Sequence, residues 1–202
     1  MRSVFCVLTL LAATAMPAHA RAAEPPKPPA GEPIKADEPE LTHKQKLDKM
    51  FAELKREKNP GAAKRIAGRI QQEWANSGSA SIDLMVGWAK TATEKKQYDV
   101  ALDFLDQAVV LDPDYAEAYN RRAGVHFAMH NFAKAMTDID QTLRLEPRHF
   151  GAMSGIAQIM QARGNKELAL EAYTRVLAVY PMDRNTQNQV STISEELAGE
   201  SI

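Results

Sequence analysis

Cysteine is almost absent from this chain of 202 residues, since Cys6 is the only one. Cys6 lies within the apolar amino-terminal run, too early for the cysteine of a lipoprotein signal, and we expect it to leave with that segment. A mature chain without cysteine has no disulfide framework and no thiolate for metal binding or nucleophilic catalysis. The sequence also has no glycosylation sequon, which favours a bacterial periplasm over a eukaryotic secretory route.

Catalytic spacings are absent as well. There is no paired-histidine zinc motif, no phosphate-binding glycine loop and no nucleophile elbow. Ser154 lies between Gly151 and Gly155, but the first glycine is one residue too far from the serine for an elbow. His126 and His130 have the spacing of metal ligands, yet no third ligand completes a site. We therefore predict no enzymatic activity, no bound metal and no cofactor.

Long apolar runs are absent beyond the first twenty residues. Within that segment Arg2, an apolar run over 4–15 and the small residues around His19 indicate a cleavable signal peptide over 1–20. The apolar run is too short for a permanent span, although an uncleaved anchor is the alternative. The sequence predicts a periplasmic protein without an integral membrane span, whose mature chain begins at Arg21.

The next segments differ sharply in composition. Residues 21–40 hold six prolines and almost nothing apolar, which predicts a disordered linker, either a spacer or a plain tail. The net charge of the chain is −1, so its overall balance does not indicate a nucleic-acid partner. Residues 41–76 carry nine Lys or Arg against four Asp or Glu, whereas 81–114 carry three against seven. The basic segment is either a binder of cell-wall polymer or membrane surface, or a solvated helix face.

A period of 34 residues runs through the second half of the chain. It is carried by a proline column, which ends helices, and by an alanine column, which suits close helix crossings. The two columns are Pro113, Pro147 and Pro181, and Ala101, Ala135 and Ala169. The segments 82–115, 116–149 and 150–183 each have the apolar pattern of two amphipathic helices joined by a short polar turn. The period therefore predicts an all-α repeat array.

The second repeat resembles the tetratricopeptide repeat (TPR) family. Tyr119 takes the family's large aromatic position, Ala123 its small one, and Ala135 and Pro147 its alanine and proline. The resemblance covers about half of the chain. It implies a right-handed superhelical solenoid of helix-turn-helix repeats.

Both ends of such an array need a cover. A capping helix with a short tail is expected within 184–202. Residues 41–81 form either a degenerate first repeat or a helical hairpin docked as an amino-terminal cap. Thr42 and Gln45 resemble a capping box at the start of this hairpin.

The resemblance also implies a function. In this family the first helices of successive repeats line a concave groove that holds a peptide or helix of a partner. We therefore expect a protein-interaction scaffold, which suits envelope assembly or maintenance, with a partner that the sequence does not identify. The groove residues expected by position are Lys90, Asn120, Arg121, Phe127, Ser154 and Gln158.

Two of these groove residues have distinct roles in the hypothesis. Arg121 offers charge-assisted hydrogen bonds to a carboxylate, and Phe127 offers an apolar anchor, unless it is packed between repeats. A subset of the family clamps the carboxyl terminus of cytosolic chaperones with basic groove residues. Here Val86, Gly151 and Gly155 stand at three of those positions, which argues against such a clamp.

Overall fold

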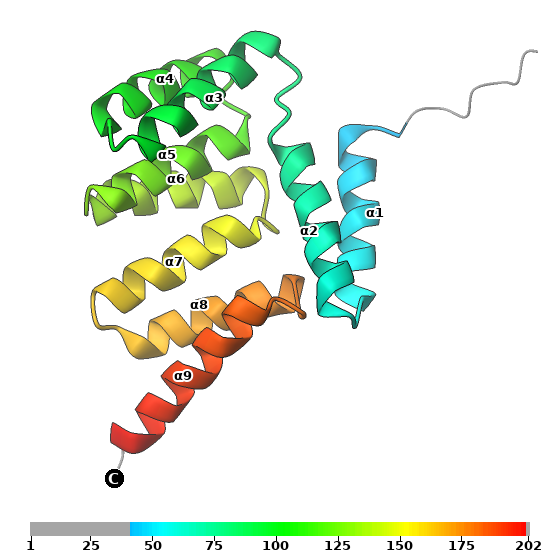
Figure 1. Cartoon of the computed structure of the whole chain (residues 1–202), viewed down its shortest axis with the longest axis vertical. Helices are drawn as coiled ribbons and strands as arrows, with labels where there is room; N and C mark the ends of the chain where they lie inside the picture. Colours follow the sequence, from blue (N-terminus) through cyan, green and yellow to red (C-terminus); the bar gives the residue numbers. More distant parts are fainter. Residues whose placement is uncertain (1–40, 201–202) are drawn as a thin grey trace, which may run out of the picture. The chain divides into compact units, whose positions relative to one another are not determined.

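The computed structural model describes residues 41–200, which form nine α-helices and no strand within that range (Figure 1). The helices are α1 (His43–Arg56), α2 (Pro60–Trp74), α3 (Ala80–Glu94), α4 (Tyr98–Leu111), α5 (Ala116–Ala128), α6 (Phe132–Leu145), α7 (Phe150–Ala162), α8 (Lys166–Val179) and α9 (Arg184–Glu200). The predicted all-α fold is confirmed. The predicted signal peptide 1–20 and linker 21–40 lie outside the described residues.

Three helix pairs form the array, and the alanine column explains how closely they pack. Ala101, Ala135 and Ala169 are each 0% exposed, and each belongs to the apolar cluster of its own pair, α3–α4, α5–α6 or α7–α8. A larger side chain at these positions would push the two helices apart. The proline column also acts as expected, because α4, α6 and α8 each end two residues before a proline.

The turn inside each pair uses the same left-handed backbone position. Gly164, expected there from its Gly-Asn turn, has φ of 78°. Lys96 and His130 stand at the same position of the first two repeats, each with φ of 58°. Only glycine adopts this conformation without steric cost, so two of the three turns hold a strained residue.

Helices α1 and α2 form a hairpin with both expected start signals. The Thr42 side chain accepts a hydrogen bond from the Gln45 amide, and the Gln45 side chain accepts one from the Thr42 amide. The predicted capping box is therefore confirmed. Asn59 caps α2 in a similar way, with Pro60 at the first helical position.

The hairpin does not lie on the first repeat, where an amino-terminal cap would stack. Its apolar side chains pack instead on the third repeat, in one cluster with Phe150, Met153, Val176 and Tyr180. The apolar cluster of the first repeat contains none of the hairpin's side chains. The link between α2 and α3 gives the physical reason. It lacks the proline of the other inter-repeat links and contains Gly78 at φ of 81°, which redirects the chain.

The carboxyl-terminal helix α9 also covers the third repeat. Ile193 is 1% exposed, and it packs with Val190 and Leu197 on the apolar cluster of α7 and α8. The predicted capping helix is therefore confirmed.

Candidate binding groove

A groove of about 360 Å³ lies along α5 and α7, and four of the six predicted residues line it. These four are Asn120, Arg121, Phe127 and Gln158. The remaining lining residues are mostly small, namely Ala123, Gly124, Gly151, Ala152 and Gly155, with Glu117, Ile139 and Ile159. Small residues therefore line both facing helices.

Lys90 and Ser154 lie elsewhere. Lys90 is exposed on α3, where its Nζ is 3.7 Å from Glu94 Oε1. Ser154 donates a hydrogen bond to the Phe150 carbonyl at 2.9 Å and lines a neighbouring cavity of about 530 Å³ between α2, α7 and the turn before α9. Gly151 borders both this cavity and the groove, so the two are adjacent.

Glu117 carries the negative charge of the groove, and the sequence interpretation missed it. Its side chain is 10% exposed, with Oε1 2.9 Å from Arg121 Nη2 and Oε2 accepting from Asn120 Nδ2 at 3.0 Å. Burial acts to raise the pKa of Glu117, but the hydrogen bond from His149 and the charge of Arg121 outweigh it, so the pKa lies below its ordinary value. Arg121 is thus already paired, which weakens its expected role toward a partner's carboxylate.

His149 contacts Glu117, and the sequence interpretation missed this residue as well. Its Nδ1 accepts a hydrogen bond from the Ala152 amide at 3.1 Å, which caps α7. Because that nitrogen is an acceptor, the proton lies on Nε2, which donates to Glu117 Oε2 at 3.1 Å. The indole of Trp74 stacks on the imidazole, with ring centroids 4.0 Å apart and planes 14° from parallel. The hairpin, the third repeat and the groove therefore meet at one side chain.

Sequence signals exist for part of this network. Glu117 stands four residues before Arg121, the spacing of an ion pair on a helix. His149 directly precedes α7, at the capping position. Its contact with Glu117 spans 32 residues, and no local pattern predicts it.

The apolar end of the groove is built around Phe127. This side chain is half-buried, and its ring lies 5.7 Å from that of Phe132 between α5 and α6. It also lines the groove, so the two alternatives for Phe127 are both partly true. A Cβ at Gly155 would lie 3.0 Å from Ile139 Cδ1, whereas one at Gly124 would meet nothing within 4 Å. The space above Gly124 is therefore open.

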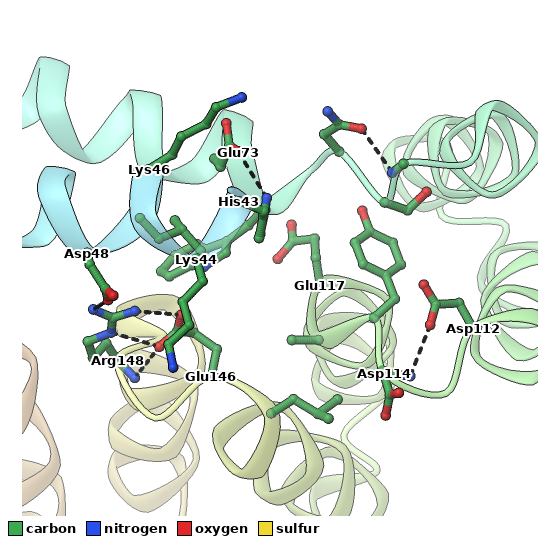
Figure 2. Close-up of a pocket in the computed structure, with 18 of the residues that line it drawn as sticks. His43, Lys44, Lys46, Asp48, Glu73, Asp112, Asp114, Glu117, Glu146 and Arg148 are labelled. Carbon is green, nitrogen blue, oxygen red and sulfur yellow. Dashed lines mark hydrogen bonds and ion pairs between the residues drawn. The ribbon is translucent and has the colours of Figure 1, made fainter. Parts of the chain in front are cut away.

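A larger cavity of about 890 Å³ lies where the hairpin meets the turns before α5 and α7 (Figure 2). Arg148 bridges the two sides. Its Nη1 is 2.6 Å from Asp48 of α1, and its Nε is 3.0 Å from Glu146. The guanidinium also lies 4.3 Å from the centre of the Phe51 ring. Arg148 therefore fastens α1 to the array beside this cavity.

The exposed surface of the hairpin is strongly basic. All four acidic residues of 41–76 have partners, since Asp48, Glu53 and Glu73 form ion pairs and Glu57 accepts from backbone amides. Several cations are exposed and make no ion pair with a described residue, namely Lys44, Lys49, Lys55, Lys58, Lys64 and Arg65. Uncompensated positive charge therefore faces solvent.

Residues 41–200 contain no group of three or more histidine, cysteine or acidic side chains placed to hold a metal ion. No helix in the same range has the length and apolar character needed to cross a bilayer.

A TPR repeat-containing protein of Rhizobium etli is 52% identical over 156 residues, which are 77% of this chain and 76% of that protein. The chain belongs to the TPR family. No family model matches it. The small glutamine-rich tetratricopeptide repeat-containing protein 2 of Saccharomyces cerevisiae is 27% identical over 117 residues, 58% of this chain and 34% of that protein.

Solved TPR domains resemble the array. The first TPR of Spaghetti (RPAP3), bound to the HSP90 peptide SRMEEVD, is 25% identical with a TM-score of 0.55, over 59% of this chain and 95% of that one. The Sgt2 TPR domain of Aspergillus fumigatus is 18% identical with a TM-score of 0.56, over 61% and 83% of the two chains. The latter likeness shows the fold alone.

Within this TPR array no basic residue stands at Val86, Gly151 or Gly155, the three positions compared above with the chaperone clamp. Val86 is 5% exposed and packs in the first-repeat cluster, so it does not face a ligand. Gly151 and Gly155 line the groove but carry no side chain.

Proposed function

We propose that this TPR chain is a non-catalytic interaction module that holds a peptide or helix of a partner protein in the groove between α5 and α7. The observation that carries the proposal is the convergence of Asn120, Phe127 and Gln158 on an open space framed by glycines. The related TPR that binds an HSP90 peptide supports a peptide as the class of ligand.

The chemistry of the groove favours an apolar anchor over an acidic one. Arg121 is the cation that lines the groove, and it is ion-paired with Glu117. It therefore offers no uncompensated positive charge to a carboxylate of the partner. A bulky apolar side chain of the partner fits above Gly124, where the space is open, beside Phe127. Buried aromatic contacts of this kind dominate interface energetics, and nearby amide side chains orient the bound backbone.

The test fills the groove without disturbing the fold. Gly124→Leu projects into open space and replaces a glycine within a helix, so the fold should be retained or slightly stabilised. Gly68→Leu is the matched control, because a Cβ there also meets nothing within 4 Å but lies on α2 outside the groove. Crosslinking of the protein in its native envelope identifies the partner. Titration then measures the affinity of each variant for that partner. We expect Gly124→Leu to weaken binding by about tenfold or more, or about 1.4 kcal/mol. Equal binding by both variants would contradict the groove.

The proposed place of action is the periplasm, where an exported scaffold serves envelope assembly or maintenance. The signal-peptide pattern over 1–20 supports this proposal. Amino-terminal sequencing of the exported product should give Arg21 as the first residue, and the product should fractionate with the periplasm. A chain that begins at Met1 and needs detergent would contradict it.

A second candidate function uses the exposed basic residues of the hairpin, which would bind an anionic cell-wall polymer or membrane surface. Lys44, Lys49, Lys55, Lys58, Lys64 and Arg65, which form no ion pair with a described residue, favour it. Sedimentation with envelope fractions should be strong at low salt and lost at high salt, because exposed charges are screened.

Charge reversal separates this surface from the net charge of the chain. Lys49→Glu with Lys55→Glu should abolish the sedimentation. Lys95→Glu with Lys134→Glu changes the net charge equally at exposed positions outside the hairpin and should leave sedimentation nearly unchanged. Equal losses in both pairs would reject the hairpin as the binding surface.

A further inference from the structure

The first repeat exposes two large apolar side chains on α3. Leu84 is 51% exposed and Trp88 is 48% exposed, one helical turn apart on α3. The Trp88 ring lies 5.2 Å from that of Phe104 on α4. We call Leu84, Trp88 and Phe104 the end face. Figure 1 shows α3 and α4 at one end of the array, away from α9.

The same positions are covered in the other repeats. One and two periods after Leu84 stand Ala118 and Ala152, which are 0% and 1% exposed. Ala118 packs in the cluster of the first repeat, and Ala152 packs in that of the second. In a TPR stack the preceding helix pair therefore covers this face, and among the described residues only the first repeat lacks that cover.

The α1–α2 hairpin has the features of the missing cover. Its apolar residues keep the 34-residue phase, since Phe51, Leu54 and Ala67 stand one period before Met85, Trp88 and Ala101. Its charge is complementary as well. Residues 41–76 have nine basic against four acidic residues, an excess of five, and 81–114 have three against seven, an excess of four negative. Asp99 and Asp103 of α4 are exposed, so their negative charges attract the basic hairpin.

Two features of the hairpin's contact with the third repeat favour its exchange to another surface. Trp74 stacks on His149 and packs on Phe150, but its Nε1 is buried without a hydrogen-bond partner among the described residues. The link over 75–79 is nearly as short as the other inter-repeat links and has Gly78 in the left-handed region. A change at this glycine redirects the hairpin without breaking a helix.

We propose that the end face is a second docking surface for the chain's own α1–α2 hairpin. The hairpin exchanges between the third repeat, where Trp74 is buried and Trp88 exposed, and the first repeat, where it continues the TPR stack and covers Trp88. The end face receives the hairpin whether or not the groove is a peptide-binding site.

The two tryptophans are the only ones in the chain, and each reports one dock. Incorporation of 5-fluorotryptophan gives two ¹⁹F signals, whose solvent isotope shifts report exposure. Phe150→Asp removes the ring that lies 4.9 Å from Trp74 and places an acid in the first turn of α7, which a helix tolerates. We expect Trp74 to become exposed in this variant and the isotope shift of Trp88 to fall about twofold or more, as the population moves to the second dock.

Two double variants decide the cause. Phe150→Asp with Leu84→Lys places a positive charge on the end face, and Trp88 should stay exposed. Leu168→Lys is the matched control, because Leu168 is also 51% exposed but lies on α8, outside both the end face and the hairpin's apolar cluster. With it, Trp88 should be protected as in Phe150→Asp alone.

Three results would overturn the proposal. Trp74 released with Trp88 still exposed would show that the end face does not receive the hairpin. Protection of Trp88 that disappears on dilution would assign the surface to a second copy of the chain. An unchanged Trp74 signal in Phe150→Asp would show that the hairpin stays on the third repeat even without the Phe150 ring, and so does not exchange.

Discussion

Arg122 joins three helices through two carboxylates of very different burial, and this contrast gives a sharp prediction. Its Nε and Nη2 donate to the two oxygens of Asp138 on α6, at 2.9 and 2.6 Å. Its Nη1 donates to Asp106 on α4, at 2.8 Å. The Asp138 side chain is 4% exposed, whereas that of Asp106 is 62% exposed. The same guanidinium therefore makes one buried and one solvated ion pair.

Alanine at each carboxylate should give very different losses of stability. Removing one partner of a buried pair costs about 3–5 kcal/mol, and Arg122 keeps Asp106, so we expect about 3 kcal/mol for Asp138→Ala. An exposed pair contributes about 0–1 kcal/mol, so Asp106→Ala should cost about 0.5 kcal/mol. At about 2–4 °C per kcal/mol for a domain of this size, the Tm should fall by about 6–12 °C and about 1–2 °C.

Urea denaturation followed by circular dichroism measures both losses. High salt should reduce the small effect of Asp106→Ala and leave the large one, because buried charges are screened far less. A double-mutant cycle with Arg122→Met isolates the Arg122–Asp138 coupling from other effects of each substitution. Equal losses for the two alanine variants, or a coupling near zero for Asp138, would refute the reasoning from burial.

Three further outcomes follow from local features. Ala135→Leu adds carbons at a fully buried helix crossing and should cost about 1–3 kcal/mol, whereas Ala128→Leu at an exposed position should cost less, and equal thermal shifts would contradict the alanine column. His130→Gly relieves a residue with φ of 58° and should stabilise the chain by about 1 kcal/mol, measured as a higher urea midpoint. Glu117 has a pKa below its ordinary value in the folded chain. The stability that its charge contributes is therefore present above the unfolded-state pKa and is lost as the pH falls through the folded-state pKa. The stability gap between the wild type and Glu117→Gln should therefore shrink on acidification, and a constant gap would contradict the network.

The repeat array could be predicted because its determinants are local and periodic. Ala135 and Gly164 act on neighbours within one repeat, and the same solution recurs at each period. The capping box at Thr42 is equally local. Four groove residues were also predicted, since their positions follow from the phase of α5 and α7.

The rest depended on contacts that the period does not encode. Trp74 marks the end of an apolar stripe, but the stripe does not say which surface it covers, and the dock at His149 lies 75 residues away. Ser154 was placed in the groove by phase, yet α2 forms a separate cavity beside it. The position of the hairpin thus explains where Trp74 and Ser154 lie.

The groove and the hairpin dock are physically connected, and the connection has a measurable consequence. His149 donates to Glu117 in the groove while Trp74 covers its ring, so release of the hairpin uncovers the side chain that fixes the charge of the groove. A ligand that binds the two arrangements with different affinity must shift the exchange by the same factor, because linkage is reciprocal. We expect Phe150→Asp, which lies outside the groove, to change the affinity for the groove ligand, and saturating ligand to change the Trp74 signal of the wild type in the corresponding direction. Unchanged affinity together with an unchanged Trp74 signal would show that His149 is a structural cap without coupling between the two sites.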